Sequence, residues 1–146
     1  AEVEAKRQEK EVEAKQEELK QLRKWVQSRA RELRTRYQGN ELFVALQEKV
    51  LNGKVAMPED FDRVEKSLLF DDVRLMRRFY TTVVEASETD RRTFLLLRFG
   101  LRKTEAASLL AHERAATSNT CDRMFERSVG RKPSTSAEAY NWLLDL

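Results

Sequence analysis

The fold is decided by residues 87–130, SETDRRTFLLLRFGLRKTEAASLLAHERAATSNTCDRMFERSVG. Ser87 can accept a hydrogen bond from an exposed backbone N–H at a helix start, and Asp90 can reach back to the backbone of Ser87. The apolar run that follows ends at Gly100, a residue suited to a left-handed helix exit. The pattern therefore predicts a first short helix between Ser87 and Gly100.

Two more helices are predicted in the same stretch. Residues 103–111 place Ala106 and Ala107 on one face, and a break near residues 112–113 precedes a helix over residues 114–128. Two short helices around a tight turn, with small residues where the helices approach each other, describe a helix-turn-helix.

This stretch resembles the LuxR-type (GerE-like) helix-turn-helix domain of bacterial transcriptional regulators. The family's helix start, apolar segment, glycine and second helix correspond in order to residues 87–90, 94–97, Gly100 and 104–110. Residues 135–140 resemble the start of the family's fourth helix. The resemblance implies a domain over residues 87–146 that binds double-stranded DNA as part of a dimeric transcriptional regulator.

In such a regulator the helix at residues 114–128 would lie in the DNA major groove. Arginine can bond a guanine edge and asparagine an adenine edge, so side chains on the outer face of this helix are candidates for base reading. The base-reading candidates are Arg114, Ser118, Asn119 and Arg123. The phosphate-binding candidates, which position a domain without reading sequence, are Lys103, Thr104, Arg127, Arg131 and Lys132. The side of the helix expected to pack inward carries Thr117, Cys121, Met124 and Phe125.

Positive charge is concentrated on the helix-turn-helix stretch. Residues 91–132 contain ten Lys/Arg and four Asp/Glu, a net charge of +6, whereas the whole chain carries +3. Binding to phosphate requires such an excess, although an ordinary solvated surface can also carry it.

A second function stays open on the same residues. The family usually opens its recognition helix with a Thr-Val pair, where this chain has Ala116-Thr117. Asp122 would be repelled by phosphate if it faced DNA. The alternative is a degenerate helix-turn-helix that acts as a protein–protein interaction or scaffold module without DNA binding.

The N-terminal part of the chain reads as one helix from Ala1 to about Tyr37, without Gly or Pro. Apolar residues recur every seven positions, as in one core row of a coiled coil. The residues predicted to dimerise are Val12, Leu19, Leu22, Val26 and Leu33. The alternative is a single helix that packs on its own domain. We expect residues 1–38 to form a coiled-coil helix that makes a homodimer.

Residues 39–86 are predicted to form a helical connector between these two parts. Helices are expected over residues 41–52, from Pro58 onward, and over residues 73–86. Aromatic side chains bury large areas and should dominate the core between them. The aromatic residues assigned to that core are Phe43, Phe61, Phe70, Phe79 and Tyr80. Because no run of alternating β-branched residues occurs, the predicted fold class is all-α.

The inventory of reactive side chains argues against an enzyme. The chain has one His, one Cys, no Gly-rich phosphate loop and no spaced set of metal ligands, so we expect neither a metal nor a cofactor. The single Cys121 fits a reducing cytoplasm. The chain starts at Ala1 inside a charged helical pattern, which suggests the C-terminal part of a longer protein. An upstream sensor domain and a membrane tether stay open.

Overall fold

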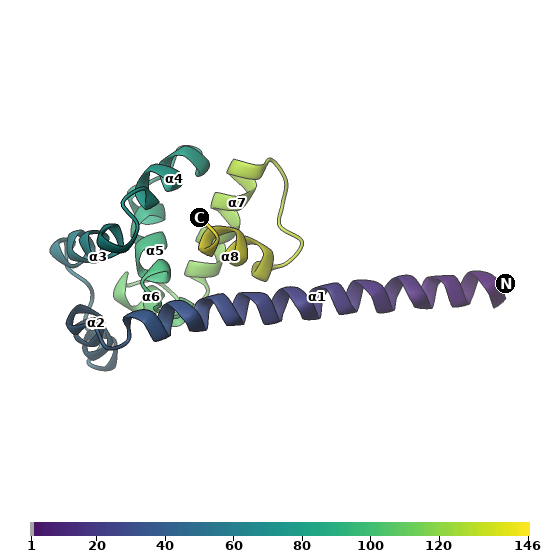
Figure 1. Cartoon of the computed structure of the whole chain (residues 1–146), viewed down its shortest axis with the longest axis horizontal. Helices are drawn as coiled ribbons and strands as arrows, with labels where there is room; N and C mark the ends of the chain where they lie inside the picture. The colour runs from purple at the N-terminus through teal and green to yellow at the C-terminus, as the bar shows by residue number, and fades with distance from the viewer. Residues whose placement is uncertain (1) are drawn as a thin grey trace.

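The computed structural model describes residues 2–146, except for the side chains of residues 22–28. In this part of the chain all regular secondary structure is helical, which confirms the predicted all-α fold class. The helices in chain order are α1 (Glu2–Tyr37), α2 (Glu41–Leu51), α3 (Pro58–Asp71), α4 (Leu75–Thr82), α5 (Glu88–Arg98), α6 (Lys103–Leu109), α7 (Ala116–Val129) and α8 (Ser136–Leu144). Helices α2 to α8 form a bundle, and the N-terminal part of α1 extends far beyond it (Figure 1).

The C-terminal turns of α1 belong to the core of the bundle. Leu33 is only 1% exposed, and the Tyr37 ring packs on Phe99 with a centroid distance of 4.7 Å. The Tyr37 hydroxyl donates a hydrogen bond to an Asp71 carboxylate oxygen 2.6 Å away. Burial and this neighbouring carboxylate raise the pKa of Tyr37 to about 12. The last turns of α1 are therefore fixed to α3 and to the end of α5.

A single hydrophobic core joins all three segments predicted from the sequence. It includes Leu33 of α1, Phe79 of α4, Phe94 of α5 and Leu143 of α8. Phe79 stacks on Phe94 with a centroid distance of 4.5 Å and an interplanar angle of 15°. One core thus includes residues on both sides of the predicted boundaries at residues 38/39 and 86/87, and the connector packs directly on the helices that follow it.

Two of the five aromatic residues assigned to the core lie on the surface instead. Phe70 is 89% exposed because it follows the buried Leu68 by two positions, which places it roughly 200° away around α3. Tyr80 is half exposed and touches Phe79 only with a ring edge. Val73 is also exposed, because α4 begins at Leu75 rather than at residue 73.

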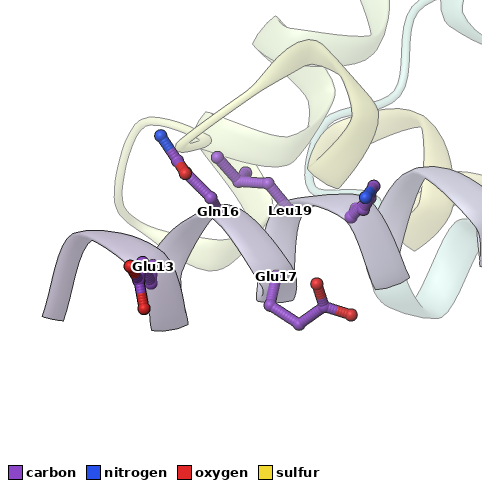
Figure 2. A pocket seen from close by; sticks show the side chains of 5 residues that line it. Glu13, Gln16, Glu17 and Leu19 are labelled. Atoms are coloured by element: carbon purple, nitrogen blue, oxygen red, sulfur yellow. The ribbon is translucent and has the colours of Figure 1, made fainter. Parts of the chain in front are cut away.

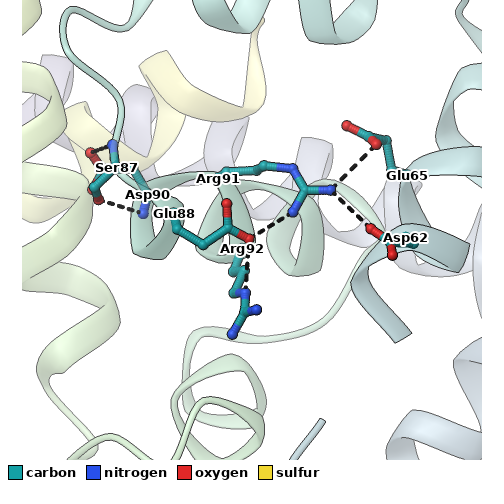
Figure 3. Close-up of polar contacts among 7 residues, drawn as sticks. All are labelled: Asp62, Glu65, Ser87, Glu88, Asp90, Arg91 and Arg92. Carbon is teal, nitrogen blue, oxygen red and sulfur yellow. Dashed lines mark hydrogen bonds and ion pairs between the residues drawn. The ribbon is translucent and has the colours of Figure 1, made fainter. Parts of the chain in front are cut away.

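Ionic contacts join α3 to the N-terminal end of α5 (Figure 3). Arg91 pairs with Glu65 at 3.3 Å on α3 and with Glu88 at 2.9 Å on its own helix. Arg92 lies over the Phe61 ring, 4.7 Å from its centroid. At the helix start, Ser87 Oγ accepts from the Asp90 backbone N–H while the Asp90 carboxylate accepts from the Ser87 N–H. The predicted capping arrangement is therefore present, and it fixes where α5 begins.

Helix α8 is covered on two sides, by α7 and by α1. The Phe125 and Trp142 rings meet edge to face at 5.6 Å, and Ala139 and Leu143 are fully buried. The connection from α7 leaves through Gly130 at φ 88°, a left-handed conformation that favours glycine. The Thr135 hydroxyl then accepts from the Glu138 N–H to start α8. The buried face of α8 is thus used within this chain.

Candidate nucleic-acid interface

Helices α6 and α7 meet at a tight turn. The His112 N–H donates to the Ala107 carbonyl at 2.9 Å, and Ala111 adopts a positive φ of 58°. Ala106 and Ala107 are buried, and their small side chains let α6 approach its neighbours closely. Helix α7 begins at Ala116, two residues later than predicted, so Arg114 lies in the turn that precedes the helix.

The two sides of α7 separate as expected from the sequence. Thr117, Cys121, Met124 and Phe125 are buried. Burial raises the pKa of the Cys121 thiol to about 12, so it stays protonated and acts as a packing residue. Among the base-reading candidates, Arg114, Asn119 and Arg123 are exposed and Ser118 is half-buried. Ser118, Asn119 and Arg123 therefore share the outer part of one helix, with Arg114 ahead of its first turn.

Asp122 is less exposed to a ligand than the sequence suggested. Its Oδ1 atom is buried and has no hydrogen-bond partner among the described atoms. Burial raises the pKa of this carboxyl group, while the charge of Lys103 acts in the opposite direction. Part of the carboxylate is therefore turned inward beside a cation rather than facing outward as an isolated negative charge.

Two of the five phosphate candidates already have ionic partners within the chain. Arg127 pairs with Asp90 at 2.7 Å and also donates to the Val84 carbonyl at 2.6 Å. Arg131 makes two hydrogen bonds to the Glu138 carboxylate, at 2.9 and 3.1 Å, which raise the pKa of the arginine. Arg127 thus links α7 to the start of α5, and Arg131 braces the connection to α8.

The other phosphate candidates differ in how they are held. Lys103 Nζ lies 4.5 Å from the centroid of the Tyr140 ring, a cation–π contact. Thr104 and Lys132 are exposed. Lys103 and Thr104 open α6, and Lys132 follows the end of α7, so these three groups flank the helix-turn-helix at two points.

A hollow of about 480 Å³ lies between the start of α5 and the outer face of α7. Arg123 and Arg127 contribute positive charge to its lining, and Glu85 and Asp90 contribute negative charge. His112, in the α6–α7 turn, also lines it. This hollow is therefore of mixed charge, and α7 itself balances Arg123 and Arg127 against Asp122 and Glu126.

Helix α1 is joined to the α5–α6 turn by a contact that the sequence did not reveal. The Arg34 guanidinium donates to both carboxylate oxygens of Glu105, at 2.7 and 3.3 Å, and to the Gly100 carbonyl at 3.2 Å. Burial opposes ionisation of Glu105, but the hydrogen bonds from Arg34 and from the Arg102 backbone N–H outweigh it and lower the pKa. No local signal points to this pair, because its members are 71 positions apart.

The residues predicted to dimerise fall into three groups. Leu33 is buried in the core of its own chain, so the alternative of a helix packed on its own domain holds for this position. The side chains of Leu22 and Val26 lie outside the described residues. Val12 is 53% exposed and Leu19 is half-buried. Figure 2 shows Leu19 and Gln16 projecting from one side of α1 and Glu17 from the other.

No protein-family model, no curated protein and no solved structure matches this chain. Within the described residues, no group of three His, Cys, Asp or Glu side chains comes together in a way that could hold a metal ion.

Proposed function

We propose that the chain is part of a DNA-binding transcriptional regulator with a LuxR-like helix-turn-helix, and that α7 enters the major groove. The observation that carries the proposal is the division of α7 into two sides. Its inner side is anchored in the core, while Asn119 and Arg123 on its outer side are exposed. Exposed Arg and Asn side chains on a helix held rigidly by its other face can bond base edges in two places each.

The proposed phosphate contacts rest on fewer residues than the sequence suggested. Arg127 and Arg131 are engaged within the chain, so their role here is to hold α7 in place. Lys103, Thr104 and Lys132 remain as groups that would position the domain on the phosphate backbone. With so few contacts, one copy would bind weakly, and a dimer that reads two half-sites would bind more tightly.

A second copy of α1 is the partner proposed for the N-terminal helix. Two shallow hollows lie along its side, one at Val12 and Ala5 and one at Leu19 and Gln16. Ala5, Val12 and Leu19 share one heptad row, and knobs from a facing helix would fill such hollows. Pairing would use the part of α1 before Leu33, because Leu33 is committed to the core.

Substituting Arg114, Asn119 and Arg123 together with alanine is expected to abolish measurable binding to duplex DNA, because the base-reading groups would be lost at once. Each good two-point base contact contributes about 1–3 kcal/mol, so the loss of three contacts should weaken binding on the order of 100-fold or more. Fluorescence anisotropy with labelled duplex DNA measures the effect, and circular dichroism should show unchanged helicity.

The matched control is the variant Asn52→Ala/Arg74→Ala/Arg77→Ala, which removes the same residue types from exposed positions just after α2, just before α4 and on α4. It should bind DNA like the unmodified chain. If the α7 variant also binds normally, α7 does not read DNA and this site assignment is wrong.

Val12→Glu combined with Leu19→Glu is expected to weaken self-association on the order of 100-fold or more, since two apolar side chains per helix lose their buried partners. Sedimentation velocity across a concentration series measures this shift. Arg7→Ala with Lys10→Ala changes the net charge equally but lies outside the apolar heptad row, so it should leave association unchanged. A self-associating glutamate variant would refute the role proposed for α1.

The alternative function, a protein-interaction or scaffold module, is favoured by the charge balance of α7. Asp122 and Glu126 offset Arg123 and Arg127, and Arg127 is paired with Asp90. Absence of DNA binding even at low salt would favour this alternative. The exposed Phe70 and Val73 would then be the first surface to test with protein partners.

In the described part of the chain, no helix combines the length and apolar character needed to cross a bilayer. A cytoplasmic location is part of the proposal, since DNA is the partner and the single Cys121 is buried and unpaired. An upstream sensor domain acting through α1 completes the proposed arrangement.

A further inference from the structure

A second hollow, of about 360 Å³, lies between the C-terminal turns of α1, the α5–α6 turn and α8. Three guanidinium groups line it, those of Arg31, Arg34 and Arg102, together with the Tyr140 ring. Lys103 stands over that ring. Among the described residues no carboxylate lines this hollow, in contrast to the mixed hollow between α5 and α7.

Two of these arginines form no ion pair within the described structure, although the charge of Arg102 also helps to lower the pKa of Glu105. Arg34 is neutralised by Glu105. Arg31 and Arg102 are exposed and form no ion pair with a described side chain. No acid stands three or four positions from Arg31 on α1, where a helical partner would have to be; those positions hold Gln27, Ser28, Arg34 and Thr35.

The charge distribution along α1 extends this positive region. Residues 2–19 contain four Lys/Arg and seven Asp/Glu, whereas residues 20–36 contain seven Lys/Arg and one Glu. The basic half is the one that approaches the bundle and the α5–α6 turn (Figure 1). Positive charge therefore continues from the start of α6 across the hollow and onto α1, through the described residues Lys20, Arg29, Arg31 and Arg36.

We propose that this hollow binds a phosphate of the DNA backbone, beyond the base pairs that α7 would read. The inference rests on the proposed function and adds a contact made by α1. Guanidinium groups bind phosphate oxygens through paired, charge-assisted hydrogen bonds, and Arg31 and Arg102 offer two such groups at the rim. Lys103 and Thr104, proposed phosphate contacts, follow Arg102 directly in the chain. The basic half of α1 spans more than a small anion would cover, which favours a nucleic-acid strand as the source of the phosphate.

The test is the salt dependence of binding to a random-sequence duplex by the full chain carrying Arg31→Ala and Arg102→Ala. Each lost phosphate contact lowers the slope of log affinity against log salt by about 0.9, so the double variant should lose about 1.8 from the slope. Affinity at low salt should fall alike for different DNA sequences. Lys54→Ala with Lys66→Ala removes the same charge from exposed positions on the loop before α3 and on α3, and should leave the slope unchanged.

The outcomes separate this inference from the proposed function. If the Arg31/Arg102 variant keeps the slope of log affinity against log salt while the α7 variant loses binding, the inference is wrong and the proposed function stands. If the Arg31/Arg102 variant has a reduced slope while the α7 variant binds normally, phosphate binding at the hollow is supported and base reading by α7 is overturned. If the chain binds no DNA at low salt, both are overturned. If inorganic pyrophosphate binds saturably at the hollow while the DNA slope is unchanged, a free phosphate compound replaces DNA as the ligand and the inference fails.

Discussion

Replacing Phe79 with alanine is expected to lower the free energy of unfolding by about 4 kcal/mol, the usual cost of removing a fully buried phenyl group. Phe79 is 0% exposed and stacks on Phe94, so the substitution removes apolar burial and leaves a cavity between α4 and α5. Chemical denaturation with urea, followed by circular dichroism, measures the change. Because one core joins the connector to α5, we expect a single cooperative transition for the bundle.

Phe70→Ala is the matched control, since both residues were assigned to the core from the sequence. Phe70 is almost fully exposed on α3, so its removal should change stability by no more than about 0.5 kcal/mol. Equal losses for the two variants would mean that Phe70 is covered by a partner in solution. A loss below about 1 kcal/mol for Phe79→Ala would contradict the packing of α4 on α5.

Gly100→Ala is expected to destabilise the protein by about 3 kcal/mol, from two causes that add. Gly100 has φ +94°, a left-handed conformation that costs an L residue about 1–2 kcal/mol. The added Cβ would also lie 2.7 Å from the Arg34 Cα and 2.9 Å from the Leu33 carbonyl carbon. These are backbone atoms, so α1 would have to move away, at a cost of about 1–3 kcal/mol. Urea denaturation measures the total.

Gly130→Ala separates the two causes. Gly130 has φ +88°, but a Cβ there would meet nothing within 4 Å, so only the backbone term applies and about 1 kcal/mol should be lost. If the two glycine variants were equally stable, the close approach of α1 to the α5–α6 turn would not exist in solution.

The sequence predicted most of the helices because their signals are local. Ser87 and Asp90 form the expected caps, Gly100 and Gly130 end helices, and Pro58 opens α3. The start of α7 was placed two residues early, since Ala115 provides no side-chain cap to mark it. Helix boundaries depend on such caps more than on propensity.

Contacts between distant segments could not be predicted in the same way. A residue in a heptad row, such as Leu33, can pack either against a facing helix of a second chain or in the core of its own chain. The folded structure shows that Leu33 is buried in the core of its own chain. Likewise, the sequence alone does not show whether an arginine in a basic stretch is free to bind phosphate or is already paired with a carboxylate of the same chain. Arg127 finds Asp90 from 37 positions away, a relation that no local pattern encodes.

The close contact of Gly100 with the backbone of α1 has a mechanical consequence. Arg34 forms an ion pair with Glu105 on one side of this contact. One turn later, the Tyr37 hydroxyl donates a hydrogen bond to Asp71. The last turns of α1 therefore cannot roll about their own axis without carrying α6, and α7 with it. If residues 29–37 were rotated about the long axis of α1, α7 would move around that axis together with them. A rotation of the last turns of α1 about the helix axis would therefore be passed on to α6 and α7.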